Sequence, residues 1–186
     1  MTMPLPVHRF TLDQYHHMGQ AGIFDEDDRV ELVHGQVVAL TPIGPDHASC
    51  VNRLTSLFAP LAGREATLSV QNPLILAEHE EPQPDFVVLR HRADGYRVAT
   101  PAARDALLVV EVGDSSAGRD RRDKIPLYAQ AAIPEAWLVD VPSDRIEVYR
   151  HPAAGRYADV TTLSRGMRLT PLAFPGLTLS VEQILG

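Results

Sequence analysis

Two carboxylates attached to apolar runs are the residues of this chain best suited to chemistry. Asp85 follows Pro84 and opens the run Phe86 to Leu89, and Glu111 closes the run Ala106 to Val110. Burying an ionised carboxylate without a specific partner is very costly, so each should face a defined partner. Two carboxylates on neighbouring strands, with a lysine nearby, would hold a hard divalent cation and aim it at a phosphate.

Both carboxylates also have simpler structural explanations. Asp85 lies at the start of a predicted strand, where an aspartate can cap a turn. Glu111 stands between five apolar residues and Val112, which predicts a strand buried on both faces. Glutamate is almost never fully buried unless paired, so Glu111 could instead form a buried ion pair with an arginine.

Lys124 is the candidate cation for this site. It lies four residues from both Asp120 and Tyr128, which places the three on one face of a predicted helix. Lys124 could form a surface pair with Asp120. Alternatively it points at the carboxylates, where it would stabilise developing charge or hold an attacking water.

Glu31 and His47 are weaker candidates. Glu31 alternates with Val30 and Leu32 in a predicted strand, so it faces the opposite side from them, toward solvent or toward the site. His47 lies near the start of a predicted helix and is either a surface histidine or a further member of the site.

Composition predicts one soluble domain spanning residues 1–186. The chain has 45% hydrophobic and 22% charged residues, as ordinary globular proteins do. No apolar run approaches the roughly 20 residues that span a bilayer, and Met1 to Phe10 lacks the pattern of a signal peptide. Cys50 is the only cysteine and is expected in the core, which excludes an intrachain disulfide and a cysteine zinc cluster. We therefore expect a cytoplasmic protein with no membrane partner.

The net charge of −7 does not by itself favour a nucleic-acid partner, because phosphate binding depends on Lys and Arg. The charge is uneven, however. Segments 90–92 and 119–124 are basic, whereas 25–31 and 78–85 are acidic. A local basic rim can bind phosphate even on an acidic protein, although each segment could equally be solvated surface.

Hydrophobic periodicity and turn residues predict an α+β fold, sandwich-like, with a mixed central sheet flanked by helices and extra β-hairpins. Helices are predicted at 11–20 with Thr11 as N-cap, 46–62, about 120–131 and 181–185; strands at 30–33, 36–40, 67–71, 74–77, 85–89, 106–112, 135–141, 145–150 and 156–162. Pro126 is tolerable only if its helix begins shortly before it. No Gly-rich phosphate loop occurs, and no nucleophile elbow surrounds Ser115 and Ser116.

The ordered motifs of the chain resemble those of the Uma-two family of bacterial restriction-endonuclease-like proteins, within the PD-(D/E)XK nuclease superfamily. The motifs that carry the resemblance are segments 30–35, 46–47, 83–85, 109–116, 120–124, 127–129 and 133–140. The resemblance implies a restriction-endonuclease-like core with Asp85 and Glu111 as ligands of Mg²⁺ or Mn²⁺. Gly113 stands where the superfamily has its lysine, so Lys124 would reach in from the next helix, with Glu31 as a fourth polar member.

Together these features lead to the hypothesis of a metal-dependent phosphodiester hydrolase that acts on nucleic acid, as a DNA endonuclease. Asp85, Glu111, Lys124 and Glu31 are its expected catalytic residues. The alternative is a catalytically silent protein that binds nucleic acid, or a regulatory oligomer with the same fold. The regulatory oligomer is suggested by the hairpins in 145–162, which leave sheet edges that could pair between subunits. We expect a homodimer, because two sites cut both strands of a duplex more easily.

Overall fold

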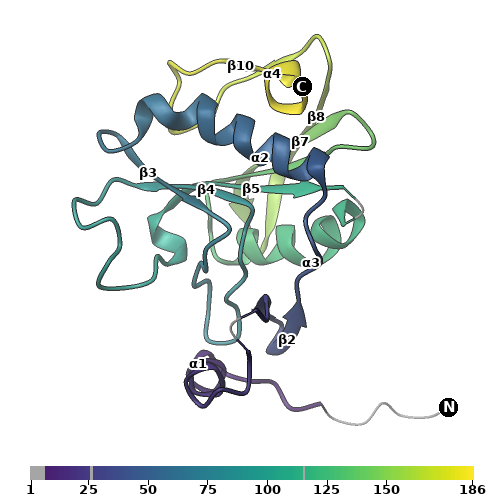
Figure 1. Cartoon of the computed structure of the whole chain (residues 1–186). Coiled ribbons are helices and arrows are strands. Elements are labelled where there is room, and N and C mark those ends of the chain that lie inside the picture. The colour runs from purple at the N-terminus through teal and green to yellow at the C-terminus, as the bar shows by residue number, and fades with distance from the viewer. Residues whose placement is uncertain (1–6, 26, 115) are drawn as a thin grey trace, which may run out of the picture.

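The computed structural model describes residues 7–25, 27–114 and 116–186 (Figure 1). Glu26, in the predicted acidic segment, and Ser115, beside Ser116, lie outside the described residues, as does most of the Met1 to Phe10 segment. Within the described ranges, no helix is long and apolar enough to cross a membrane.

A six-stranded mixed sheet forms the centre of the fold, as predicted. Its order is β3 (Ala66–Val70), β4 (Phe86–Arg90), β5 (Ala106–Gly113), β6 (Glu135–Asp140), β7 (Arg145–Ala153) and β8 (Arg156–Ser164). Every neighbouring pair is antiparallel except β5 and β6, which are parallel. A parallel pair needs a long crossover, and here the crossover is helix α3 (Ala117–Gln130).

Helices cover both faces of the sheet (Figure 1). On one face, α2 (Pro45–Phe58) and α4 (Val181–Leu185) pack over a core that includes Cys50, Phe86 and Trp137. On the other, α3 packs over a second core that includes Tyr128 and Leu138. The α+β sandwich expected from the sequence is thereby confirmed, and Cys50 is a buried core residue.

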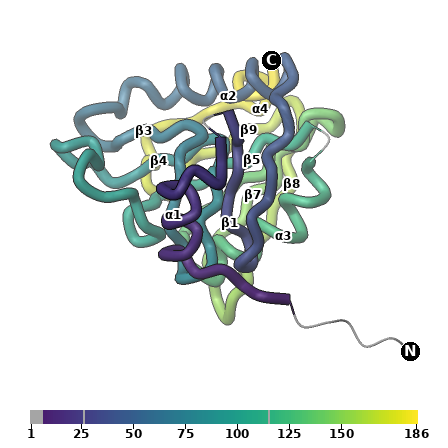
Figure 2. Tube along the Cα trace, turned by 60° about the horizontal axis from the view of Figure 1, so that its bottom comes forward, coloured from purple at the N-terminus to yellow at the C-terminus, as the bar shows by residue number. Residues whose placement is uncertain are grey.

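The N-terminal part forms a separate layer that carries one site residue. Helix α1 (Leu12–Gln20) begins at Thr11, whose side chain caps it as predicted. Strands β1 (Val30–Val33) and β2 (Gln36–Ala39) form the expected hairpin. In the view of Figure 2, α1 and β1 lie in front of the strands of the central sheet. The backbone of Leu32 exchanges two hydrogen bonds with Glu81, at 2.8 and 3.2 Å, which docks the hairpin onto the main domain.

The predicted strand at 74–77 was wrong. The amides of Leu74, Ile75 and Leu76 donate to carbonyls of three separate residues, Pro82, Pro101 and Glu80. Segment 80–82 turns back beside 74–76, but Pro82 has no N–H to return a bond, so only isolated bridges form here and no ladder. The short elements β9 (Arg168–Leu169), β10 (Leu179–Ser180) and the 3-10 turn Ala103–Asp105 were not predicted. The helix predicted at 46–62 ends as a 3-10 turn, Ala59–Leu61.

Helix α3 begins earlier than expected. Pro126 lies nine residues after the first residue, Ala117, so the expectation that the helix begins shortly before the proline was wrong. The early start follows from close packing of the helix on the end of β5. A Cβ atom added to Gly113 would lie 2.5 Å from both Cα and Cβ of Ala117. Only glycine leaves room for this approach.

We predict that Gly113→Ala destabilises the fold by about 1–3 kcal/mol, because its methyl group would overlap backbone that cannot move freely. Gly118→Ala is the matched control. It lies in α3, the helix whose start packs on Gly113, with nothing within 4 Å of its would-be Cβ, and it should stabilise the fold by about 0.5–1 kcal/mol through helix propensity. Urea unfolding followed by the fluorescence of Trp137, the only tryptophan, measures both. Equal effects of the two substitutions would contradict the packing argument.

Candidate active site

A cavity of about 90 Å³ brings together the residues singled out from the sequence. Asp85, directly before β4, and Glu111, in β5, border it from two neighbouring chain segments, and Lys124 and Asp120 border it from α3. Residues 40–44, which lead into α2, cover one side. Phe86 pairs with Val110 where β4 and β5 run side by side. Asp85 and Glu111 are the next residues in that direction, so they lie opposite each other at the same end of the two strands.

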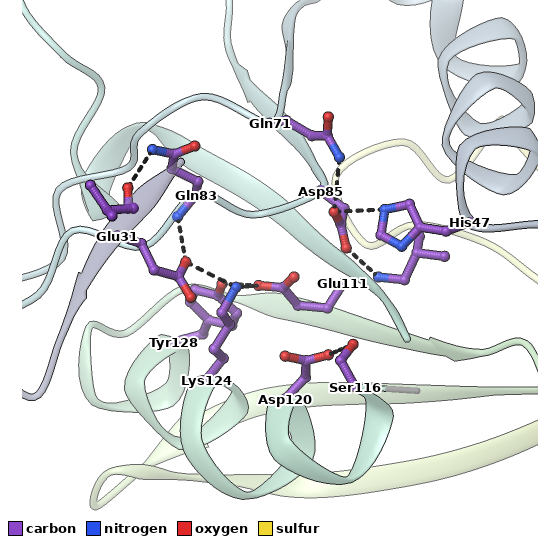
Figure 3. A network of polar contacts seen from close by, with 12 residues as sticks. Glu31, His47, Gln71, Gln83, Asp85, Glu111, Ser116, Asp120, Lys124 and Tyr128 are labelled. Atoms are coloured by element: carbon purple, nitrogen blue, oxygen red, sulfur yellow. Dashed lines mark hydrogen bonds and ion pairs between the residues drawn. The ribbon is translucent and has the colours of Figure 1, made fainter. Parts of the chain in front are cut away.

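Lys124 joins two carboxylates from distant parts of the chain (Figure 3). Its Nζ lies 3.1 Å from Glu31 Oε2 and 3.4 Å from Glu111 Oε1. The three side chains are 2–6% exposed. The surface alternatives for Lys124 and Glu31 were therefore wrong. Glu31 also accepts a hydrogen bond from the backbone amide of Gln83 at 3.0 Å, which fixes it in the docked hairpin.

Glu111 is buried beside Lys124 and Tyr128, not beside an arginine. The Tyr128 hydroxyl donates to Glu111 Oε1. The arginine pair considered from the sequence does occur in this fold, but at Glu135, whose Oε1 lies 2.7 Å from Arg150. Tyr128 and Lys124 lie one helical turn apart, so the predicted shared face of α3 is the face turned to the site.

Asp85 is held by three groups and does not cap a turn. Its Oδ2 accepts the backbone amide of Val112 at 2.8 Å, and its Oδ1 accepts Gln71 Nε2 at 3.3 Å. His47 Nε2 lies 2.9 Å from Oδ1, although the ring N–H is not aligned with that oxygen. His47 is thus a member of the site, not a surface residue.

The charges of the site follow from burial and from these contacts. Burial raises the pKa of Glu111 well above its ordinary value, and Lys124 opposes that shift. Burial alone would lower the pKa of Lys124, but Glu111 and Glu31 outweigh it and raise that pKa, which keeps the ammonium charged. Burial would raise the pKa of Asp85, because it favours the neutral form. His47 and the Val112 amide favour the carboxylate more strongly, and the pKa of Asp85 is lowered.

The family described as "Uma2: Putative restriction endonuclease" matches residues 12–182. The chain belongs to the Uma2 family. A crystal structure described as a "putative nuclease belonging to DUF820 from Anabaena variabilis" has a TM-score of 0.71 and 18% sequence identity, and the match covers 97% of this chain and 98% of that one. A search of curated proteins found no match.

The structural likeness shows that this Uma2 chain and the Anabaena protein share a fold. The family resemblance noted from the sequence motifs is confirmed, and with it the restriction-endonuclease-like core.

Sequence reasoning did not assign several polar neighbours to this Uma2 site, although it placed Asp120 on the same helix face as Lys124. Asp120 is 3% exposed, lines the cavity and accepts the Ser116 hydroxyl at 2.6 Å. Burial raises its pKa. Gln71 and Gln83 orient Asp85 and Glu31 from loops, where no periodicity marks them. The sequence also held a further signal for Lys124, which was predicted: it is the only lysine among 17 Lys and Arg residues.

The donor set fits a hard cation that keeps much of its water. Among the described residues, no three His, Cys, Asp or Glu side chains are grouped as metal ligands. Mg²⁺ in proteins is often bound through only one or two carboxylates, with water and substrate phosphate completing its shell. Asp85 and Glu111 supply two carboxylates at the edge of a polar cavity, which satisfies that requirement.

We predict that the pKa of Lys124 in the folded protein lies above its ordinary value of 10.5. With ¹³C-labelled lysine, the single side chain gives one Cε resonance to titrate. Since the folded pKa is raised, the contribution of the ion pairs to stability is complete below pH 10.5 and is lost as the pH rises through the folded pKa. Glu31→Gln should lower the pKa, and Glu65→Gln, at an exposed position, should not. A folded pKa below 10.5 would mean that desolvation dominates.

Proposed function

We propose that this Uma2 chain is a metal-dependent phosphodiesterase that cleaves nucleic acid, with DNA as its substrate and internal bonds as its targets. The observation that carries the proposal is the buried ammonium of Lys124 between Glu31 and Glu111, at a cavity that Asp85 also borders. Membership in a family described as "Putative restriction endonuclease" supports the same reaction.

Asp85 and Glu111 are the residues that would hold Mg²⁺ or Mn²⁺. Such an ion, when bound, lowers the pKa of a bound water and polarises a phosphate. Glu111 has the environment for this role, because burial and the negative charges of Asp85 and Asp120 all raise its pKa. A divalent cation beside it would offset both the burial and the repulsion.

The chain's own residues position the phosphate and balance its charge. Lys124 presents a fixed positive charge where negative charge develops on the phosphate. Glu31 holds that ammonium in place, and Tyr128 fixes Glu111. Arg29 and Arg119 line the same cavity and would bind the phosphate backbone on either side of the scissile bond. The Val112 amide and Gln71 hold the carboxylate of Asp85 in one orientation.

A catalytically silent protein that binds nucleic acid is the second candidate. It is favoured by the glycine at position 113, where the superfamily has its lysine. This candidate predicts nucleic-acid binding that persists when Glu111 is replaced. The two functions therefore differ in what Glu111→Gln does to binding and to cleavage.

We predict that supercoiled plasmid or single-stranded DNA is cut with Mg²⁺ or Mn²⁺ and not with chelator. Lys124→Met, Asp85→Asn and Glu111→Gln should each reduce the cleavage rate by about 10²-fold or more, as loss of a charge-stabilising group does elsewhere. Arg122→Ala is the control, because that side chain lies on the same helix and is 72% exposed. Unchanged cutting by Lys124→Met would reject the assignment, and binding without cutting would favour the silent protein.

We also predict that Mn²⁺ binds beside Lys124 in the absence of substrate. Its unpaired electrons should broaden the single lysine Cε resonance, and Mg²⁺ should reverse the broadening by competition. The effect should disappear in Glu111→Gln and persist in Arg122→Ala. A resonance that stays sharp at saturating Mn²⁺ would place the ion elsewhere, whatever the activity.

A further inference from the structure

Strand β8 ends the six-stranded sheet on the side opposite β3 (Figure 1). It pairs with β7 along one edge only in the part of the chain that the structure describes. Five consecutive residues, 158–162, are exposed, and Val160 is 55% exposed. The opposite edge strand, β3, has five residues, all at least partly buried. The nine-residue β8 is therefore the more open of the two edges.

An open edge of this kind invites another strand. Its unpaired N–H and C=O groups form a template, and proteins usually block such edges with charged side chains, above all lysine, or with proline, bulges or a covering element. β8 contains no lysine or proline, and its two charged residues are Arg156, at its first position, and Asp159, which is paired with His151. Its register with β7 stays constant from Arg145–Ser164 to Ala153–Arg156, so no bulge twists the edge away. Val160, Thr161 and Thr162 are β-branched, which favours an extended strand.

We propose that β8 pairs in an antiparallel manner with β8 of a second copy of this chain, about a two-fold axis through Val160. This register alone overlaps the full strand, because Val160 is the central residue of Arg156–Ser164. The two sheets would then form one continuous sheet. The inference concerns assembly and does not depend on the proposed nuclease activity.

The charges of β8 agree with this register. Arg156 would lie opposite Ser164 of the second copy, and Asp159 opposite Thr161. Asp159 already has a partner in its own chain, because one of its carboxylate oxygens lies 2.6 Å from His151. A register centred on Asp159 would place two carboxylates directly opposite each other. A register centred between Val160 and Thr161 would place Arg156 opposite Arg165. Like charges directly opposite are destabilising.

The number of hydrogen bonds is that of a specific interface. In an antiparallel pair, alternate residues exchange two main-chain bonds each. A full overlap of nine residues therefore forms about eight to ten bonds, depending on which alternate set faces outward. A typical protein interface has about ten direct hydrogen bonds.

The two-fold axis makes a disulfide test possible. A residue on the axis faces its own copy, with a Cα separation of about 4.5–5.5 Å in an antiparallel pair, which a disulfide can span. We expect Val160→Cys to oxidise to a covalent dimer. Thr162→Cys, which would face Ala158, and Val98→Cys, on a loop and 79% exposed, should stay monomeric on a non-reducing gel. The native Cys50 is buried and does not interfere. Equal crosslinking of all three variants would overturn the proposed register.

Solution mass tests the pairing without a crosslink. Light scattering should give twice the chain mass of 20.4 kDa for the unmodified protein. Val160→Lys places two ammonium groups opposite each other and should weaken the dimer about fivefold or more in sedimentation equilibrium. Val98→Lys should leave it unchanged. A 20.4 kDa mass for the unmodified protein throughout the concentration range would overturn the proposal, including the case in which the edge serves a different partner.

Discussion

One buried ammonium holds three separate parts of this chain together. Lys124 comes from α3, Glu111 from β5 and Glu31 from the N-terminal hairpin, and each is nearly inaccessible to solvent. Removing one member of such a cluster leaves an uncompensated buried charge, which typically costs about 3–5 kcal/mol. The hairpin therefore cannot leave the main domain without exposing or unpairing Lys124. The paired backbones of Leu32 and Glu81 and the Gln83 amide hold it in the matching position.

The place of the lysine follows from the packing at the end of β5. Position 113 is two residues after Glu111, so a side chain there would point to the same face of the strand. That space is taken by the backbone of Ala117, where α3 begins. A lysine at 113 and this start of α3 exclude each other. The helix instead returns a lysine to Glu111 from its third turn, with Tyr128 one turn further along.

The sequence was sufficient for the parts of the fold that depend on local patterns. Long apolar runs predicted the central strands, and Thr11 correctly predicted the start of α1. The failures were non-local. The bonds of segment 74–77 are divided between segment 80–82 and Pro101. The packing of Ala117 on Gly113 overrides the rule that Pro126 should lie near a helix start. For the site, alternation predicted that Glu31 and Leu32 face opposite sides, but not that both sides are covered.

The chain uses arginine and lysine for different tasks. Glu135 is fully buried, yet Arg150, the Trp137 indole and the Leu172 amide all donate to its carboxylate. A planar guanidinium offers several donors in a fixed geometry. Together with the indole and the amide it occupies both oxygens of Glu135, whose role is therefore structural.

Lysine acts differently at Glu111. Its ammonium is a compact point charge on a flexible stem, so it can neutralise Glu111 and Glu31 without filling the cavity beside them. Apart from Lys124, every basic residue counted among the 17 Lys and Arg of this acidic protein is an arginine. The only lysine lies beside the buried carboxylate of Glu111 at the cavity. In the proposed function, its compact head leaves space there for a phosphate that a guanidinium would fill.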